Sequence, residues 1–246
     1  MKTGYILFFD LDGTVLTEGK LSEKNRDALI AAKKAGNYLV INTGRSKGTV
    51  QKEVLTAIPW DGMICGSVYV EWQGEVMLNH TLSNETLQSV LTYSKEADQP
   101  LVLEGVTDNY SLGCPHYAPS IDGKVEEFLQ KENNVSKVTF VKKLDPATVP
   151  EFPGLRVIFF PRYAEGIAKG YTKKTGMDML LAKTGIDHSM TAAFGDSEND
   201  REMLKYAAMS IAMKHAPKDY DDFIDYRATD AEYGVAESLY HLGFAK

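Results

Sequence analysis

The sequence predicts an α/β fold in which helices cover a mainly parallel sheet and a second domain is inserted. Short apolar runs alternate with helical segments at both ends of the chain, and this alternation is typical of parallel sheets with helices on their faces. The middle of the chain, residues 82–165, has a different pattern. We therefore expect a core made of residues 1–81 and 166–246, interrupted by an α/β insert.

The N-terminal elements form a strand-helix-strand unit. The run Ile6–Phe9 is continuously apolar, as expected of a strand that is buried on both faces. Ser22–Ala35 has apolar residues at helical spacing, with Ser22 as the cap and Gly36 as the stop. Tyr38–Ile41 reads as the next strand. Parallel strands need such a crossover, so this unit predicts a parallel sheet.

The C-terminal part repeats this alternation. We expect a helix at Lys173–Thr184, a strand at Thr191–Phe194, a helix at Met203–Ala208 and a strand at Ser210–Met213. The insert is expected to contain helices at Asn84–Ala97 and Asp122–Lys131, and strands at Leu101–Glu104, Val138–Val141 and Arg156–Phe160.

The composition excludes several classes of protein. The 246-residue chain is 43% hydrophobic and has a net charge of −7, so it lacks the basic field that general nucleic-acid or anionic-membrane binding needs. No apolar run approaches the ~20 residues of a membrane span, and no signal peptide is recognisable. Cys65 and Cys114 form no CxxC pair, so we expect reduced thiols in a cytoplasmic protein.

Two carboxylates directly follow the first apolar run. Asp10 and Asp12 are separated by one residue, and such residues point to the same face of a strand. Ligand sites of open parallel sheets lie beyond the carboxyl ends of the strands, and Mg²⁺ would relieve the repulsion between adjacent carboxylates. An EF-hand loop does not fit, because Leu21 stands where its last ligand, a glutamate, is required. A polar turn remains an alternative.

Two further loops carry polar groups after predicted strands. Asn42–Arg45 offers a hydroxyl, backbone N–H groups and a guanidinium, which suit a phosphate. Gly195–Asp200 brings Asp196 and Asp200 to a strand-to-helix loop. Lys173 stands at a helix start, where the helix dipole disfavours a cation. An ordinary turn, helix capping and a surface lysine are the respective alternatives. The usual nucleotide-binding patterns GxxxxGK[ST] and GxGxxG are absent.

Four stretches of the chain resemble, in order, the signature motifs of the haloacid dehalogenase (HAD)-like phosphatases: FFDLDGT, INTGR, TKKTGMDMLL and GDSENDREML. The chain looks most similar to the Cof-like hydrolases, which are related to sucrose-phosphate phosphatase. That subgroup has a Rossmann-like core and an α/β cap between the second and third motifs, where the insert is predicted. Tyr233–Glu237 also resembles the family's C-terminal segment.

The resemblance implies a role for each motif. Asp10 is implied to be the nucleophile that forms an aspartyl-phosphate, and Asp12 the general acid and base. Thr43 is implied to bind phosphoryl oxygens, and Lys173 to neutralise Asp10 and the phosphate. Mg²⁺ is the implied cofactor, with Asp10, Asp196 and the backbone carbonyl of Asp12 as ligands. Residues implied to support the metal and the phosphate are Gly44, Arg45, Asn199 and Asp200.

The sequence departs from the family pattern at two places. Cys65–Val68 stands where many relatives have an Asn-Gly pair, and Lys214–Ala216 stands where many have Gly-Asn-Ala. Both departures concern the substrate or the shape of the opening to the site rather than the four motifs. Residues that we expect to influence substrate selection, with an ordinary loop position as the alternative, are Tyr110, His116, Tyr117 and His215.

The predicted function is Mg²⁺-dependent hydrolysis of small phosphorylated metabolites, with sugar phosphates as the first candidates. A phosphotransferase or mutase of the same fold is one alternative. A sugar-phosphate-binding module without activity is another, but it predicts a broken motif, and all four motifs are complete. The sequence predicts neither the individual substrate nor the oligomeric state.

Overall fold

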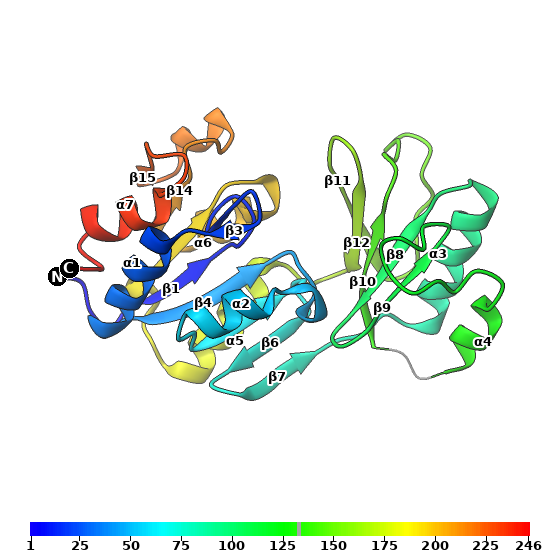
Figure 1. Cartoon of the computed structure of the whole chain (residues 1–246), viewed down its shortest axis with the longest axis horizontal. Coiled ribbons are helices and arrows are strands. Elements are labelled where there is room, and N and C mark those ends of the chain that lie inside the picture. Colours follow the sequence, from blue (N-terminus) through cyan, green and yellow to red (C-terminus); the bar gives the residue numbers. More distant parts are fainter. Residues whose placement is uncertain (132–133) are drawn as a thin grey trace. The chain divides into compact units, whose positions relative to one another are not determined.

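The computed structural model, which describes residues 1–131 and 134–246, contains two units, each built on its own sheet (Figure 1). The first unit comprises Met1–Gly44, Val50–Met77 and Thr172–Lys246, and the second comprises Arg45–Thr49 and Leu78–Tyr171. The predicted α/β architecture with an inserted second unit is confirmed. The role of that unit as a cap, and the domain boundaries at residues 82 and 165, stay predictions.

The sheet of the first unit has eight strands in the order β15-β14-β13-β1-β4-β5-β6-β7. Neighbouring strands from β15 to β5 are parallel, and β6 runs antiparallel to β5. The strands are β1 (Ile6–Phe9), β4 (Tyr38–Thr43), β5 (Gly62–Cys65), β6 (Tyr69–Trp72), β7 (Glu75–Asn79), β13 (Thr191–Gly195), β14 (Met209–Ala212) and β15 (Tyr226–Arg227). A separate two-stranded sheet, which the sequence did not predict, pairs β2 (Leu16–Thr17) with β3 (Lys20–Leu21).

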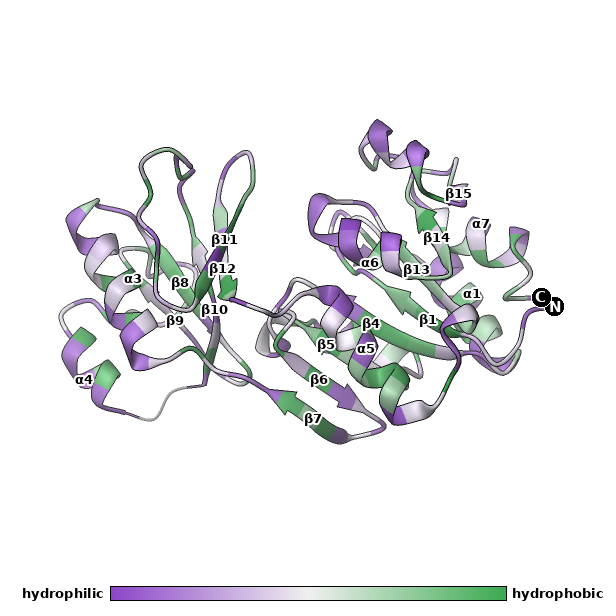
Figure 2. Ribbon diagram, turned by 180° about the vertical axis from the view of Figure 1, so that it is seen from behind, coloured by the Kyte–Doolittle hydropathy of each residue, from purple (hydrophilic) through white to green (hydrophobic). Residues whose placement is uncertain are grey.

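The central strands form the core of this unit. All four residues of β1 are fully buried, because β1 lies between β13 and β4 and has helices on both sides. Phe9 of β1 stacks on Phe194 of β13, with the ring centroids 4.4 Å apart. Figure 2 shows hydrophobic residues concentrated on β1 and β4. Burial on both faces explains why these strands appear in the sequence as continuous apolar runs.

Helices cover the two faces of the parallel sheet. α1 packs against α7 on one face, and α5 packs against α6 on the other (Figures 1 and 2). The helices are α1 (Glu23–Lys34), α2 (Lys52–Ala57), α5 (Lys173–Thr184), α6 (Arg201–Tyr206) and α7 (Gly234–His241). Ser22 caps α1 by accepting the N–H of Asn25 at 3.2 Å, as predicted. Among the described residues, no helix is both long and apolar enough to cross a membrane.

The second unit contains a five-stranded sheet in the order β11-β12-β10-β8-β9, with every pair antiparallel. Its elements are α3 (Asn84–Glu96), β8 (Leu101–Gly105), β9 (Asn109–Leu112), α4 (Val125–Gln130), β10 (Val135–Phe140), β11 (Leu155–Phe159) and β12 (Ala164–Ala168). The helices and strands predicted for the insert are all present, and α4 is shorter than expected. β9 and β12 were not predicted, because each is short and lacks a continuous apolar run.

Gly176 allows α5 to lie close to the sheet. A Cβ atom at this position would lie 2.6 Å from the side chain of Ile64, which is fully buried in β5. In a solvated helix, Gly→Ala is favourable by about 1 kcal/mol. Here the added methyl group has no space, so close packing of α5 on β5 requires glycine.

We expect Gly176→Ala to lower the free energy of unfolding by roughly 1–3 kcal/mol, as over-packing does in a filled core. Urea unfolding monitored by circular dichroism measures the change. In an Ile64→Ala background the same substitution should have a smaller effect, because the Ile64 atoms that the new methyl group would meet are all removed. A Gly176→Ala variant more stable than the parent would show that the helix does not approach the sheet this closely.

Candidate active site

Asp10 lies at the carboxyl end of β1, the central strand of the parallel sheet. Its side chain is buried, whereas Asp12 is exposed. The expectation that the two carboxylates share one face of a strand is therefore wrong. The strand ends at Phe9, and the chain turns at once, with the N–H of Leu16 donating to the carbonyl of Leu11 at 2.8 Å. This turn removes the strand periodicity on which the expectation depended.

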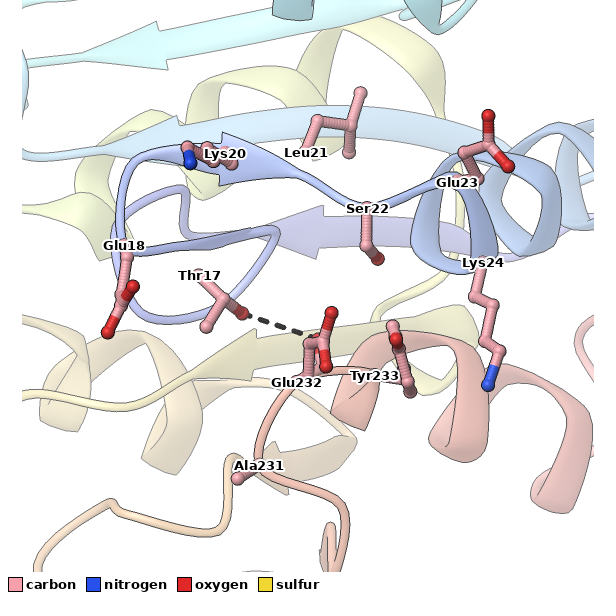
Figure 3. Close-up of a pocket in the computed structure, with 10 residues that line it drawn as sticks. All are labelled: Thr17, Glu18, Lys20, Leu21, Ser22, Glu23, Lys24, Ala231, Glu232 and Tyr233. Atoms are coloured by element: carbon pink, nitrogen blue, oxygen red, sulfur yellow. Dashed lines mark hydrogen bonds between the residues drawn. The ribbon is translucent and has the colours of Figure 1, made fainter.

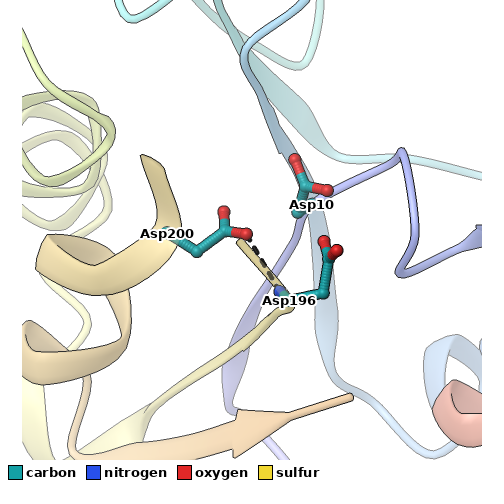
Figure 4. A group of neighbouring side chains, drawn as sticks. All are labelled: Asp10, Asp196 and Asp200. Atoms are coloured by element: carbon teal, nitrogen blue, oxygen red, sulfur yellow. Dashed lines mark hydrogen bonds between the residues drawn. The ribbon is translucent and has the colours of Figure 1, made fainter. Parts of the chain in front are cut away.

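Three carboxylates lie close together, and two of them pair with a buried lysine. Asp10, Asp196 and Asp200 each offer an oxygen atom, and these atoms lie within 4.8 Å of one another (Figure 4). The Nζ atom of Lys173 lies 2.6 Å from Asp10 and 2.5 Å from Asp200. Lys173 is 3% exposed and Asp200 is completely buried. The fold thus brings the first, third and fourth sequence motifs together at one edge of the sheet.

Asp200 is fixed by hydrogen bonds on both of its oxygens. Oδ1 accepts from Lys173, and Oδ2 accepts the backbone N–H groups of Asp196 and Ser197 at 3.0 Å each. These bonds satisfy a carboxylate that is removed from water. Asp200 therefore holds both the lysine and the loop that carries Asp196.

The charges of this cluster shift the pKa values of Asp10 and Lys173. Burial raises the pKa of Asp10 well above its usual value, and Asp200 and Asp196 add to the rise, while Lys173 opposes it. Burial by itself would lower the pKa of Lys173, but the carboxylates of Asp10 and Asp200 outweigh it and hold this pKa above its usual value. The lysine is therefore protonated at neutral pH, and the cluster contains more acidic than basic groups.

The start of α5 positions Lys173. Thr172 caps the helix together with Thr175, each side chain accepting a backbone N–H of the other. Asn42, which is buried in β4, donates its Nδ2 hydrogen to the carbonyl of Lys173 at 3.2 Å. The alternative of a solvated surface lysine is therefore wrong for Lys173.

Gly13 allows the first loop to approach Asp196. Its φ angle is +81°, and a Cβ atom there would lie 2.5 Å from Oδ2 of Asp196 and 3.0 Å from Nε2 of His215. Only glycine combines this backbone angle with such close neighbours. Thr14, in the same loop, donates to Oδ1 of Asp196 at 3.3 Å.

His215 lies at the candidate site in the loop after β14. Its Nε2 atom is 3.0 Å from Oδ2 of Asp196, and its side chain is half exposed. The hydrogen bond to Asp196 raises the pKa of His215. Its predicted part in substrate selection stays a prediction, but the structure places it next to the acidic cluster.

The second motif is divided between the two units. Thr43 is the last residue of β4 and is buried, and Gly44 directly follows it in the first unit. Arg45 belongs to the second unit and donates to the carbonyl of Thr49 at 3.1 Å. In the fourth motif, Asn199 accepts the Ser197 hydroxyl at 3.0 Å. The phosphate-binding roles of these residues stay predictions.

The residues predicted to select the substrate in the insert all lie in the second unit. Tyr110 packs edge-on against Phe128 with 5.0 Å between ring centroids, which indicates a packing role. The rings of His116 and Tyr117 are in contact, with 4.2 Å between their centroids, and Tyr117 is 60% exposed. Their roles toward a substrate stay predictions.

Three residues that support the site were not predicted from the sequence. Asn42 and Thr14 stand within the motifs INTGR and FFDLDGT, which was the available signal, but no role was assigned to either side chain. Tyr220 is distant in sequence and donates its hydroxyl hydrogen to the carbonyl of Ser197 at 2.7 Å. No local pattern connects Tyr220 with the loop that it supports.

A pocket of about 770 Å³ lies apart from this cluster, beside the β2-β3 hairpin (Figure 3). Residues of both charges line it, including Glu18, Lys20 and Glu232. Thr17 of the hairpin donates to the carbonyl of Glu232 at 3.3 Å. The lining includes no member of the acidic cluster, so this pocket is not part of the candidate active site.

The acidic cluster fits a hard divalent cation. The donors are carboxylate oxygens, the ligands that Mg²⁺ prefers. Three carboxyl groups gather here, and Lys173 pairs with two of them, Asp10 and Asp200. Buried charges of one sign are unfavourable unless they are paired, so this excess favours a cation.

Comparison with known proteins agrees with this geometry. A family model described as haloacid dehalogenase-like hydrolase matches residues 7–239. The chain belongs to this family. Phosphatase YwpJ of Bacillus subtilis is 22% identical over 284 residues, with 96% of this HAD-like hydrolase and 99% of the relative covered. The B. subtilis protein 5-amino-6-(5-phospho-D-ribitylamino)uracil phosphatase YitU is 26% identical over 267 residues, with 96% of each chain covered.

A solved structure also resembles this HAD-like hydrolase over its whole length. A HAD subclass IIB sugar phosphatase matches with a TM-score of 0.83 and 25% identity, covering 98% of this chain and 99% of the other. The match includes both units of the chain. The family and fold that the four motifs predicted are confirmed.

Removal of the buried lysine should destabilise the protein strongly. In Lys173→Met, Asp10 and Asp200 remain buried without their cation, so we expect the free energy of unfolding to fall by roughly 3–5 kcal/mol at neutral pH. The measurement is urea unfolding in the presence of a chelator. The control is Lys174→Met, because Lys174 is partly exposed and pairs with Asp178 along α5; it should change stability by less than about 1 kcal/mol. Equal effects of the two substitutions would contradict a special role for Lys173.

Proposed function

We propose that this HAD-like hydrolase is a Mg²⁺-dependent phosphomonoesterase that acts through an aspartyl-phosphate on Asp10. The observation that supports it best is the position of Asp10, at the end of the central strand and 2.6 Å from a protonated lysine. Phosphoryl transfer is catalysed mainly by positioning and by charge stabilisation, and the cluster offers both.

The reaction takes place in two steps. In the first, the Asp10 carboxylate attacks phosphorus, and the bond to the alcohol oxygen breaks as that oxygen takes a proton from Asp12. In the second, Asp12 removes a proton from a water molecule, which attacks the aspartyl-phosphate and releases inorganic phosphate. Lys173 reduces the repulsion between Asp10 and the phosphate dianion. Asp12 is suited to carry protons because it is exposed, while Asp10 is buried.

The metal site is proposed at Asp10, Asp196 and the backbone carbonyl of Asp12, with Asp200 holding the loop. A bound Mg²⁺ would supply positive charge that favours the ionised form of Asp10 and attracts phosphoryl oxygens. Neighbouring residues of this chain hold the proposed metal ligands in position. Asp200 and Thr14 fix Asp196 from two sides, and Gly13 allows the first loop to come close.

Small phosphorylated metabolites with several hydroxyl groups are the proposed substrates. Two similar proteins support this class: one is named a sugar phosphatase, and the other a phosphatase of a phospho-ribitylamino compound. A panel of sugar and polyol phosphates tests the proposal, with release of inorganic phosphate as the readout. Transfer of the phosphoryl group to an added alcohol instead would indicate a phosphotransferase.

Substitution of Asp10 and substitution of Asp12 should impair different steps of the reaction. Asp10→Asn loses the nucleophilic charge, so we expect neither turnover nor phosphoenzyme. Asp12→Asn keeps the nucleophile, so with an aryl phosphate, whose leaving group needs little acid help, it should form the phosphoenzyme and then stall. Its turnover should fall by about 10²–10⁴-fold. Intact-mass spectrometry after a rapid acid quench detects the added phosphoryl group. A phosphoenzyme in Asp10→Asn would exclude Asp10 as the nucleophile.

Activity should depend on Mg²⁺. We expect a chelator to abolish hydrolysis and added Mg²⁺ to restore it, while Ca²⁺ should not, because Ca²⁺ takes more ligands in looser geometry. Asp196→Asn should need a higher Mg²⁺ concentration for half-maximal activity. Asp219→Asn is the control, since Asp219 is exposed and pairs with Arg201, and it should behave as the parent. Full activity in excess chelator would remove the metal from the proposal.

A further inference from the structure

The turn between β5 and β6 has an unusual backbone. Gly66 and Ser67 both have positive φ angles, +56° and +64°, and the N–H of Val68 donates to the carbonyl of Cys65 at 3.2 Å. Positive φ at both central residues is typical of tight hairpin turns and favours glycine, asparagine or aspartate. Serine at such a position is disfavoured because its Cβ crowds the backbone.

Two other hairpins of the same unit show what this backbone normally requires. Their turn residues are Glu18-Gly19 and Gln73-Gly74, all with positive φ. In both turns the second position is glycine, and the first is an exposed side chain. In the β5-β6 turn the order is reversed, so that Ser67 takes the position that glycine takes elsewhere. The turn itself therefore does not explain the serine.

Ser67 also has a low exposed fraction, although its hydroxyl oxygen is not among the completely buried side-chain atoms without a partner. The exposed fraction of Ser67 is 6%, whereas Glu18, Gln73 and Asp98, the other described non-glycine residues with positive φ, are all exposed. Within residues 1–131 and 134–246, nothing bonds to the Ser67 hydroxyl. The hydroxyl is therefore available to a ligand rather than used within the described part of the chain, and a strained backbone at such a position is common at functional sites.

The turn lies at the same edge of the sheet as the acidic cluster. Phe9 of β1 pairs with Ile41 of β4, and Thr43 at the end of β4 pairs with Cys65 at the end of β5. Ser67 follows two residues later. Neighbouring strands are about 4.8 Å apart, so the turn is two strands away from β1, on the far side of Thr43. That distance suits the organic part of a phosphoester whose phosphorus lies at Asp10.

We propose that Ser67 binds a hydroxyl group of the substrate's alcohol part and thereby favours polyol over aryl phosphates. The inference rests on the proposed phosphatase function. Serine offers one donor and acceptor without charge, which suits a neutral hydroxyl better than the phosphate, whose charge Lys173 and the metal site match. The substrate hydroxyl then supplies the partner that the Ser67 side chain lacks.

The test compares glucose 6-phosphate and glycerol 3-phosphate with p-nitrophenyl phosphate, which has no hydroxyl groups beyond its phosphate. In Ser67→Ala and Ser67→Gly, we expect kcat/KM for the polyol phosphates to fall about three- to tenfold, the effect of one lost neutral hydrogen bond. The value for p-nitrophenyl phosphate should change less than about twofold, since the remaining catalytic groups are intact.

Thermal unfolding separates binding from a structural role. Ser67→Gly relieves the strained φ, so its Tm should equal or exceed that of the parent even as it loses activity toward polyol phosphates. The matched control is Gln73→Ala, because Gln73 also has a positive φ angle and stands in the turn at the other end of β6. It should leave the kcat/KM values for both substrate classes unchanged.

The outcomes distinguish a failure of the Ser67 inference from a failure of the proposed phosphatase function. Selective loss toward polyol phosphates in both Ser67 variants supports the inference. Equal loss toward both substrate classes, or no loss in an active protein, overturns it and leaves the phosphatase function in place. A parent protein that hydrolyses no phosphomonoester overturns the proposed function, and the inference about Ser67 with it.

Discussion

The buried ion pairs of Lys173 with Asp10 and Asp200 are the interaction on which the candidate active site depends. The lysine stands in the first turn of α5, where the helix dipole disfavours a cation, and it is almost completely removed from water. Two carboxylates at about 2.5 Å offset both costs. Buried ion pairs seldom add net stability compared with apolar side chains. Their presence at the end of the central strand is therefore better explained by reactivity than by folding.

The parallel sheet makes this arrangement possible. β1 lies between β4 and β13, so the loops that leave all three strands begin at the same edge. Because the apolar strands bury their own residues on both faces, the polar groups are confined to the loops beyond them. Asp10 and Asp196 approach each other for this reason, although 186 positions separate them in the sequence.

Close backbone approaches hold the groups in place. Gly13 lets the first loop touch Asp196. Gly195 leaves room for the side chain of Asp200, since a Cβ atom there would lie 2.7 Å from it. Gly176 brings α5, and with it Lys173, onto β5. Each contact leaves little freedom to the charged groups, so their geometry is set before a substrate binds. Preorganised charge of this kind is the main means by which proteins catalyse phosphoryl transfer.

The sequence by itself determined the fold class, the strands with continuous apolar runs and the four motifs. These features are local. Burial on both faces requires every residue of β1 to be apolar, and the hydrogen bond that marks the start of α1 joins Ser22 to Asn25, three residues later. Only the tertiary structure decided how the carboxylates are arranged around Lys173. It showed that the chain turns directly after β1, which separates Asp12 from Asp10, and it added Asp200 to the group around Lys173. It also supplied Asn42 and Tyr220 as supports and, among the residues that the structure describes, gave the Ser67 hydroxyl no hydrogen-bond partner. Such contacts join residues distant in the chain, and no local pattern encodes them because they arise only when the strands and helices pack together.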